Sequence, residues 1–313
     1  MIKKIYMYRI YVSISFIFLF FLQRNILAQN DTIKILQISD THLVSQLQYS
    51  NPIFAKLRSH LIGSTDSLKK FFKIYPQKYN ADAVIINGDI IDYYKTVSSH
   101  FGNNLSNPIS KFNSITKLCK KPLYLTLGNH DIASFLVNEI DSTKIEIHSD
   151  ANNARAEWIR EIPVFKNGTY YKKEYLVGKT KYHIFFLDNA YRLNDKYING
   201  QSRVLDKIQL DWFNEQLEKI GSEPVILFLH IYFPIGDING DGIYFRKNKS
   251  INWPDTVACS DGLLKTLNEH SNIKAMFVGH QHRNVWEEII FPSGNKIYQI
   301  ETSALFKTTK NWR

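Results

Sequence analysis

The sequence predicts a layered α/β domain with a mixed sheet, and three observations support this class. Short apolar runs rich in Ile and Val recur along the chain after residue 30, as in strands buried on both faces. Amphipathic or polar segments separate these runs, which is typical of strands alternating with helices. The runs between Tyr171 and Leu187 are interrupted only by Gly178-Lys179, which favours a hairpin over a crossover.

The expected elements can be placed along the chain by residue range. Strands are expected over 33–38, 83–86, 123–127, 183–187, 225–229 and 275–278. One helix begins near a cap at Ser260 and ends near His270. The clearest helix runs from Asp206 to Ile220, stops at Gly221 and places these apolar residues partly on one face: Ile208, Leu210, Trp212, Phe213 and Leu217. Since no repeat or low-complexity linker is visible, residues 29–313 are expected to form one domain.

The first 28 residues resemble a secretory signal peptide. Basic residues precede an apolar run from Ile10 to Leu22, and Ala28 is a small residue before a possible cleavage point. The run is shorter than the roughly 20 residues that span a bilayer, so no permanent membrane span is expected, and an anchored form is the alternative. Cleavage would remove four basic residues and no acidic one, lowering the formal charge from +10 to +6. The mature protein is therefore expected to be exported, either periplasmic or extracellular.

Charge and cysteine content narrow the range of possible functions only slightly. A moderate basic excess suits anionic substrates, and no Lys/Arg cluster interleaved with aromatic residues supports nucleic-acid binding. Cys119 and Cys259 are the two cysteines; they either pair or remain free thiols, and they do not form a metal site. The sequence leaves the oligomeric state open.

Polar side chains follow five of the apolar runs, where a packed core would not choose them. In open α/β sheets, ligands gather at the carboxyl ends of strands, so these side chains are expected to meet in one crevice. Imidazole, carboxylate and amide oxygen together suit divalent Zn, Fe or Mn. Glycines at 88, 128 and 279 would let the backbone turn sharply and approach the ions. The five segments are DTH (40–42), GDIID (88–92), GNHD (128–131), His230 alone, and GHQH (279–282).

These five segments, in this order, resemble the calcineurin-like metallophosphoesterases. The resemblance covers roughly residues 33–304, including FLDN and the QLDWFNEQL helix between the third and fourth segments. It implies a two-sheet mixed β-sandwich flanked by helices, in four layers. It also implies two divalent metal ions (Mn, Zn or Fe), with a bridging hydroxide that attacks phosphorus in a small phosphorylated substrate.

The resemblance also assigns roles to individual residues. His130 would contact the phosphoryl group or protonate the leaving oxygen, and Asp92 would orient its imidazole. Asp131 is expected to support the loop. His280 and His282 would serve different ions, with a bend at Gly279 and Gln281 pointing away. The implied ligands are Asp40, His42 and His282 for one ion, Asn129, His230 and His280 for the other, and Asp89 as the bridge.

Departures from two subfamilies narrow the expected substrate. Tyr93 and Asp131 stand where protein serine/threonine phosphatases carry arginine and glutamate, and His42 stands where purple acid phosphatases carry a non-histidine residue. With these two subfamilies disfavoured, the sequence resembles a broad bacterial group of small-molecule phosphodiesterases. Phosphodiesters are therefore favoured over phosphomonoesters as substrates. The alternative is a metal-holding protein that binds phosphorylated ligands with little or no turnover.

The segment after His230 leaves two interpretations open. Residues 237–242 fit the opening of a calcium loop, but Asn248 stands where such a loop needs glutamate, so a glycine-rich loop beside His230 is preferred. The aromatic residues of this region either contact an organic leaving group or pack in the core: Tyr232, Tyr244 and Trp253.

Overall fold

Two β-sheets form the centre of the molecule in the computed structural model, which describes residues 32–44, 52–95, 108–137, 144–147, 150–190, 205–232, 262–291 and 293–307. The first sheet has three parallel strands in the order β1-β2-β3. They are β1 (Ile35–Ile38), β2 (Ala83–Asn87) and β3 (Leu123–Thr126). All five residues of β2 are buried, as the middle strand of a covered sheet should be.

The second sheet is mixed, in the order β10-β11-β9-β8-β7-β6. Its interior pairs β7–β8, β8–β9 and β9–β11 are parallel, whereas the edge pairs β6–β7 and β10–β11 are antiparallel. The mixed sheet and the hairpin predicted from the sequence are therefore confirmed. The strands are β6 (Tyr171–Val177), β7 (Thr180–Phe186), β8 (Val225–Phe228), β9 (Ile273–Val278), β10 (Val285–Ile290) and β11 (Lys296–Glu301).

An aromatic layer packs between the two sheets. Ile85 of β2 shares one buried cluster with Ile184, Phe186 and Phe228 of the second sheet. Within it, the rings of Phe228 and Phe277 stack with centroids 4.8 Å apart and planes 8° apart. Apolar side chains on both inner faces explain why these strands read as continuous apolar runs.

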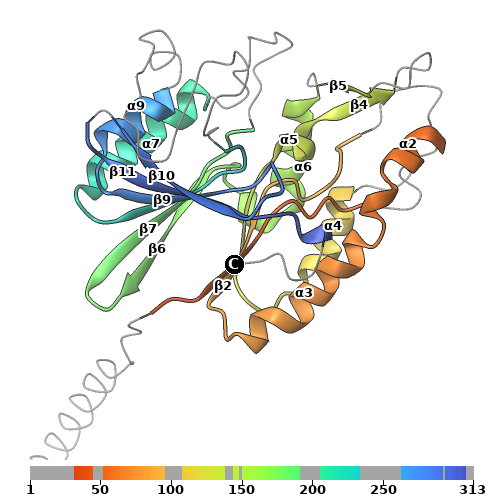
Figure 1. The fold of residues 1–313 in the computed structure, drawn as a ribbon, viewed down its shortest axis with the longest axis horizontal. Coiled ribbons are helices and arrows are strands. Elements are labelled where there is room, and N and C mark those ends of the chain that lie inside the picture. Colours follow the sequence, from red (N-terminus) through yellow and green to blue (C-terminus); the bar gives the residue numbers. More distant parts are fainter. Residues whose placement is uncertain are drawn as a thin grey trace, which may run out of the picture.

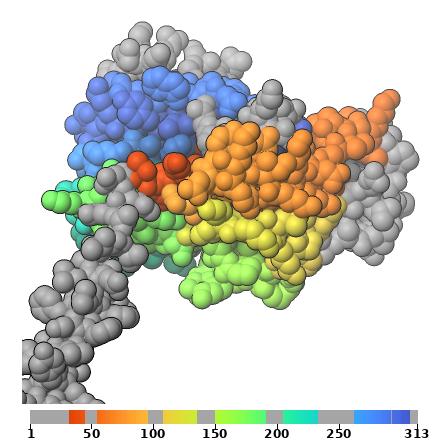
Figure 2. All heavy atoms as spheres, turned by 90° about the horizontal axis from the view of Figure 1, so that it is seen from below, coloured from red at the N-terminus to blue at the C-terminus, as the bar shows by residue number. Residues whose placement is uncertain are grey.

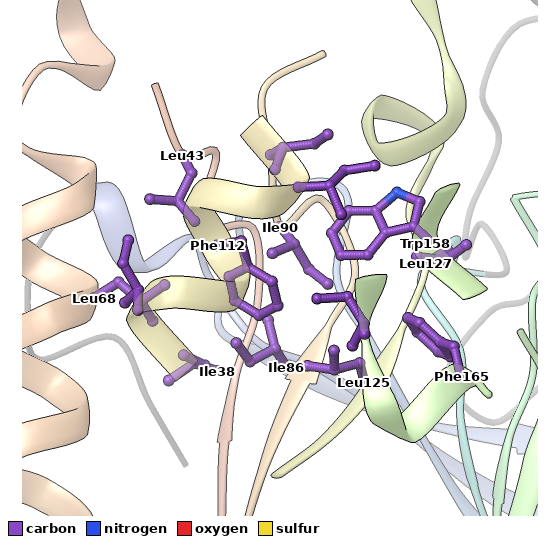
Figure 3. Packing of buried hydrophobic residues seen from close by; sticks show 14 of the residues in the cluster. Ile38, Leu43, Leu68, Ile86, Ile90, Phe112, Leu125, Leu127, Trp158 and Phe165 are labelled. Carbon is purple, nitrogen blue, oxygen red and sulfur yellow. The ribbon is translucent and has the colours of Figure 1, made fainter. Parts of the chain in front are cut away.

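Helices cover both outer faces, which gives the four predicted layers (Figure 1). On the first sheet, Leu68 of α3 (Ser64–Lys78), Phe112 of α4 (Pro108–Thr116) and Trp158 of α6 (Ala151–Glu161) share a core with β1–β3. Figure 3 shows Phe112 and Trp158 among the buried aliphatic side chains of this cluster, which include Ile86 and Leu125. The space-filling view in Figure 2 shows α3, in orange, beside α4, in yellow, on the surface.

The second sheet is covered by α7 (Lys207–Ile220) and α9 (Gly262–Glu269), whose apolar residues pack on β8 and β9. The predicted limits of α7 are confirmed: the Asp206 side chain accepts a hydrogen bond from Gln209 N, and Gly221 ends the helix with φ 64°. Ile208 was wrongly placed on the buried face, because its side chain is 76% exposed. Buried Phe213 lies five positions further along the helix, a rotation of roughly 140° around its axis.

Shorter elements complete the described chain. They are α2 (Pro52–Leu57), α5 (Asn129–Ile132), the hairpin β4 (Ser134–Val137) and β5 (Lys144–Ile147), and the 3-10 turns η1 (Ser59–Leu61), η2 (Pro163–Phe165) and η3 (Leu305–Lys307). Within the described ranges no helix has the length and apolarity needed to cross a bilayer. The predicted signal peptide, Ser260 and Cys259 lie outside the described residues.

Candidate metal centre

The carboxyl ends of β1, β2 and β3 meet those of β8 and β9, as the sequence predicts. Two hydrogen bonds join the sheets there. His230 Nδ1 donates to the carbonyl of Asn87 at 2.8 Å, and Asn87 Nδ2 donates to the carbonyl of Phe277 at 2.8 Å. His280 N also donates to Asp40 Oδ2 at 3.1 Å. Among the described residues, three groups of potential metal-binding side chains result, each with ligand atoms within 4.8 Å of one another.

The first group consists of Asp40, His42 and His282. His282 Nε2 lies 3.2 Å from Asp40 Oδ1 and 3.3 Å from His42 Nε2. Burial lowers the pKa of His42, so its imidazole stays neutral and keeps a lone pair. Lone pairs and a carboxylate that converge in a buried place fit a divalent cation.

The second group consists of Asp89, His230 and His280. His230 is fully buried, and its Nε2, which has no hydrogen-bond partner among the described residues, lies 3.2 Å from Asp89 Oδ2. Burial alone would lower the pKa of His230, but the Asp89 charge raises it to about 10. A positive charge is therefore needed between these side chains, and a metal ion satisfies that need as a proton does. Burial lowers the pKa of His280 to about 4, which keeps that imidazole neutral.

Asp89 and Asn129 are two further ligands that the family resemblance implies, and both lie beside these groups. Asp89 Oδ2 also lies 3.7 Å from His42 Nε2, so the Asp89 carboxylate stands between the two groups. Asn129 Oδ1 lies 2.9 Å from His280 Nδ1, beside the second group. His280 and His282 thus fall in different groups, and the Gln281 between them is exposed.

His130 and Asp92 form a third cluster with His42. His130 Nδ1 lies 2.5 Å from the Asp92 main-chain carbonyl, whereas the Asp92 carboxylate is 3.5 Å away. The same carboxylate lies 3.4 Å from His42 Nδ1. Asp92 therefore contacts both imidazoles, and its main-chain oxygen lies nearer to His130 than its carboxylate does.

Arg58 was not predicted as part of the site. Its Nε donates to Asp92 Oδ2 at 2.8 Å, and its Nη2 donates to the other oxygen of the same carboxylate. The Arg58 guanidinium is thus the positive charge beside the Asp92 carboxylate. In the other two groups, a metal ion would be that positive charge. No sequence signal marks Arg58, because it follows α2 and belongs to no strand end or motif.

Two further carboxylate and amide side chains hold the loops in place. Asp131 supports its loop as predicted: it accepts hydrogen bonds from the backbone N–H groups of Ile90, Ile91 and Gly128. Asn189, in the FLDN segment, accepts hydrogen bonds at Oδ1 from the N–H groups of His230 and Ile231, each at 3.0 Å. The FLDN pattern was the sequence signal that included Asn189, and it did not indicate a function for this side chain.

The backbone of the site is unusual because five of the predicted ligands have positive φ. A side chain in this left-handed region costs about 1–2 kcal/mol, and glycine avoids that cost. The bend predicted at Gly279 is made by His280 instead. Gly279 is needed for close approach, since a Cβ there would lie 2.0 Å from Ser39 Oγ. The five φ values are 50° for Asp40, 39° for His42, 47° for Asp89, 78° for His280 and 57° for His282.

The residues after Tyr232 lie outside the described part of the chain, including the possible calcium loop at 237–242, Tyr244 and Trp253. Tyr232 itself is buried beside His280, with ring centroids 6.1 Å apart. The guanidinium of Arg283 lies 5.3 Å from the centre of the Tyr232 ring. Tyr232 therefore forms one wall of the second group.

A sequence profile for calcineurin-like phosphoesterases matches residues 33–284, which include all the predicted metal ligands. The chain belongs to this family. It is therefore a phosphoric ester hydrolase of a family that depends on two metal ions, and the two groups described above are its candidate ligands.

Individual relatives agree with this family. A probable glycerophosphodiester phosphodiesterase from Arcobacter nitrofigilis is 24% identical over 264 residues, covering 82% of this chain and 75% of the relative. A probable cyclic nucleotide phosphodiesterase from Fibrobacter succinogenes is 25% identical, covering 81% and 74%. The crystal structure of a dimetal phosphatase from Danio rerio superposes with a TM-score of 0.53 at 15% identity, covering 88% of each chain, which supports the fold.

Proposed function

We propose that this phosphoesterase hydrolyses small phosphodiesters at a dinuclear metal centre. The observation that carries the proposal is the position of Asp89 between two histidine-containing groups, 3.2 Å from His230 Nε2 and 3.7 Å from His42 Nε2. Two divalent ions, Mn, Zn or Fe, would be held on either side of Asp89. Their ligands would be Asp40, His42 and His282 on one side, and Asn129, His230 and His280 on the other.

When bound, the ions would supply Lewis-acid charge and an activated water for attack on phosphorus. The chain supplies the proton donor. His130 N donates to Asp89 Oδ1 at 2.9 Å, which fixes His130 next to the centre. Because Nδ1 is engaged by the Asp92 carbonyl, Nε2 remains to donate a proton to the leaving oxygen.

The charges around the centre favour a diester over a monoester. A monoester carries up to one more negative charge and gains from an additional cation. Among the described residues, two arginines lie next to the groups, and both are paired with buried carboxylates: Arg58 with Asp92, and Arg283 with Glu301 at 2.8 Å. A phosphodiester monoanion needs no further cation. Both bacterial relatives described above are probable phosphodiesterases, which points the same way.

An activity panel tests the proposal. Metal-free protein is reconstituted with Mn, Zn or Fe(II) and assayed with bis(p-nitrophenyl) phosphate, p-nitrophenyl phosphate, cyclic nucleotides and glycerophosphodiesters. We expect turnover only with metal, and a higher kcat/KM for diesters than for the monoester. Asp89→Asn should remove the activity, while His270→Ala, on a histidine that precedes β9 at the strand end opposite the candidate ligands, should retain it. Tight binding of a diester without product by metal-replete protein would instead establish the metal-holding binding protein.

We also propose that residues 1–28 form a cleaved signal peptide and that residues 29–313 are exported as the mature domain. The order of basic, apolar and small residues supports this. Intact-mass measurement of the protein from the growth medium and the cell envelope tests it. A mature mass that still includes residues 1–28 would show a retained anchor.

A further inference from the structure

The segment that follows β11, residues 302–306, lies beyond the part of the chain that matches the family profile. It is nevertheless hydrogen-bonded to both loops that carry ligands of the first group. Ala304 forms a parallel bridge with Ser39, and Leu305 N donates to the carbonyl of Ser39 at 3.1 Å, directly before Asp40. Ser303 Oγ donates to the carbonyl of His282 at 2.7 Å. The segment therefore links the two loops that carry Asp40 and His282.

Phe306, at the end of this segment, packs on two of the candidate ligands. Its ring centroid lies 5.4 Å from that of His42 and 5.3 Å from that of His282, with planes 75° and 85° apart. Both are edge-to-face contacts, the arrangement that aromatic rings favour. Leu305 beside it is buried in the same core cluster as Leu68 of α3, which anchors the ring. In Figure 1 this dark blue end of the described chain lies beside α3 and α4.

The two groups differ in how their histidines are oriented. In the second group, the hydrogen bond from His230 Nδ1 to the Asn87 carbonyl fixes the ring. In the first group, His42 Nδ1 is buried without a hydrogen bond of good geometry, 3.4 Å from Asp92 Oδ1. The 3.4 Å contact with Asp92 constrains the His42 ring less than the 2.8 Å hydrogen bond constrains the His230 ring, so packing contributes more to the orientation of His42.

We propose that Phe306 is a positioning residue that holds the His42 and His282 imidazoles in the orientation needed to retain one ion, at the first group and not at the second. The proposal rests on the ligand assignment in the proposed function. Groups that orient metal ligands from outside the coordination sphere commonly change metal affinity by about 10–100-fold. We expect about tenfold here, because the ring acts on two ligands without a hydrogen bond to either.

Metal titration of variants that keep only one of the two groups complete tests the proposal without any activity assay. His280→Ala leaves the first group complete, and His282→Ala leaves the second group complete. Phe306→Ala is added to each, and Mn²⁺ or Zn²⁺ affinity is measured by calorimetry or chelator competition. In the His280→Ala background, Phe306→Ala should weaken binding about tenfold, and Phe306→Tyr, which keeps the ring, should not. In the His282→Ala background, Phe306→Ala should change nothing.

A matched control removes an aromatic ring beside the second group instead of the first. Tyr232→Leu removes the ring beside His280, so it should leave the first group unchanged. Phe306→Leu keeps apolar volume and replaces Phe306→Ala if the latter does not fold, as judged by circular dichroism of metal-free protein. Equal weakening of both groups, or of neither, overturns the inference. If the wild-type chain binds no divalent ion at all, the proposed function fails first, and that result is distinct from two ions retained unchanged in Phe306→Ala.

Discussion

Arg58 pairs with Asp92 through both oxygens of a carboxylate that is completely buried. Burial alone would raise the pKa of Asp92, but contacts with His130 and His42 and the charge of Arg58 hold it well below its usual range. One carboxylate thus joins an arginine, a candidate metal ligand and the candidate proton donor. Arg58 also lies 5.7 Å from the centre of the Tyr93 ring, which packs on His130.

Arg58→Met should destabilise the metal-free protein by about 3 kcal/mol at pH 7, because it leaves a buried charge without its partner. The folded pKa of Asp92 is depressed, so the stabilisation is complete above its unfolded pKa of about 3.9 and is lost as the pH falls through the folded pKa. The difference between wild type and variant should therefore shrink below about pH 4. Urea unfolding at pH 7 and pH 3 measures it, and an equal difference at both would assign the effect to packing.

His130→Ala should reduce kcat/KM in proportion to the difficulty of leaving-group departure. General acid catalysis contributes roughly 10²–10⁴-fold when the leaving oxygen needs a proton. We expect a loss near the lower end of that range for alkyl diesters and a much smaller one for p-nitrophenyl diesters. A series of aryl and alkyl phosphodiesters measures this dependence. An equal loss across the series would mean that His130 binds the phosphoryl group instead.

Asp131→Ala should lower the free energy of unfolding by about 3 kcal/mol or more, since three buried N–H groups lose their hydrogen-bond acceptor. Asp131→Asn keeps one oxygen acceptor and should cost less. Denaturant unfolding of both variants gives the comparison. Equal costs for the two would show that the carboxylate geometry, and not the number of acceptors, sets the stability of this loop.

Asn189→Ala should weaken metal binding at the second group by about tenfold, because His230 loses the support of its backbone N–H. Asn189→Asp keeps the acceptor for the N–H groups of His230 and Ile231 and loses the donor to the Ile231 carbonyl, so it should have a smaller effect. The His282→Ala background isolates this group for titration. Unchanged affinity in Asn189→Ala would contradict the role given to this side chain.

The sequence predicted the covered strands and missed the partly exposed ones, for a physical reason. A strand buried on both faces, such as β2, reads as a continuous apolar run. By contrast, β10 and β11 carry Glu287, Glu288 and Lys296 among their apolar residues and alternate between two environments. The ends of the buried strands could be read together as one set of ligands because five motifs occur in order.

Residues that act from outside the motifs could not be predicted. Arg58 and Phe306 reach the site through tertiary contacts between segments far apart in the sequence, and no local pattern encodes such contacts. The bend at His280 was missed for a related reason. Glycine is the residue expected at a left-handed position, yet here the close approach of Ser39 and Asp40 already requires a glycine at 279.

The left-handed backbone at the candidate ligands sets folding stability and chemistry against each other. Glycine at Asp40, His42, Asp89, His280 or His282 would relieve conformational strain while deleting a metal-binding atom. Variants of this chain selected only for heat resistance should therefore accumulate glycine or asparagine at those positions and lose catalytic activity. Variants selected for turnover should keep all five side chains and gain their stability in other parts of the fold.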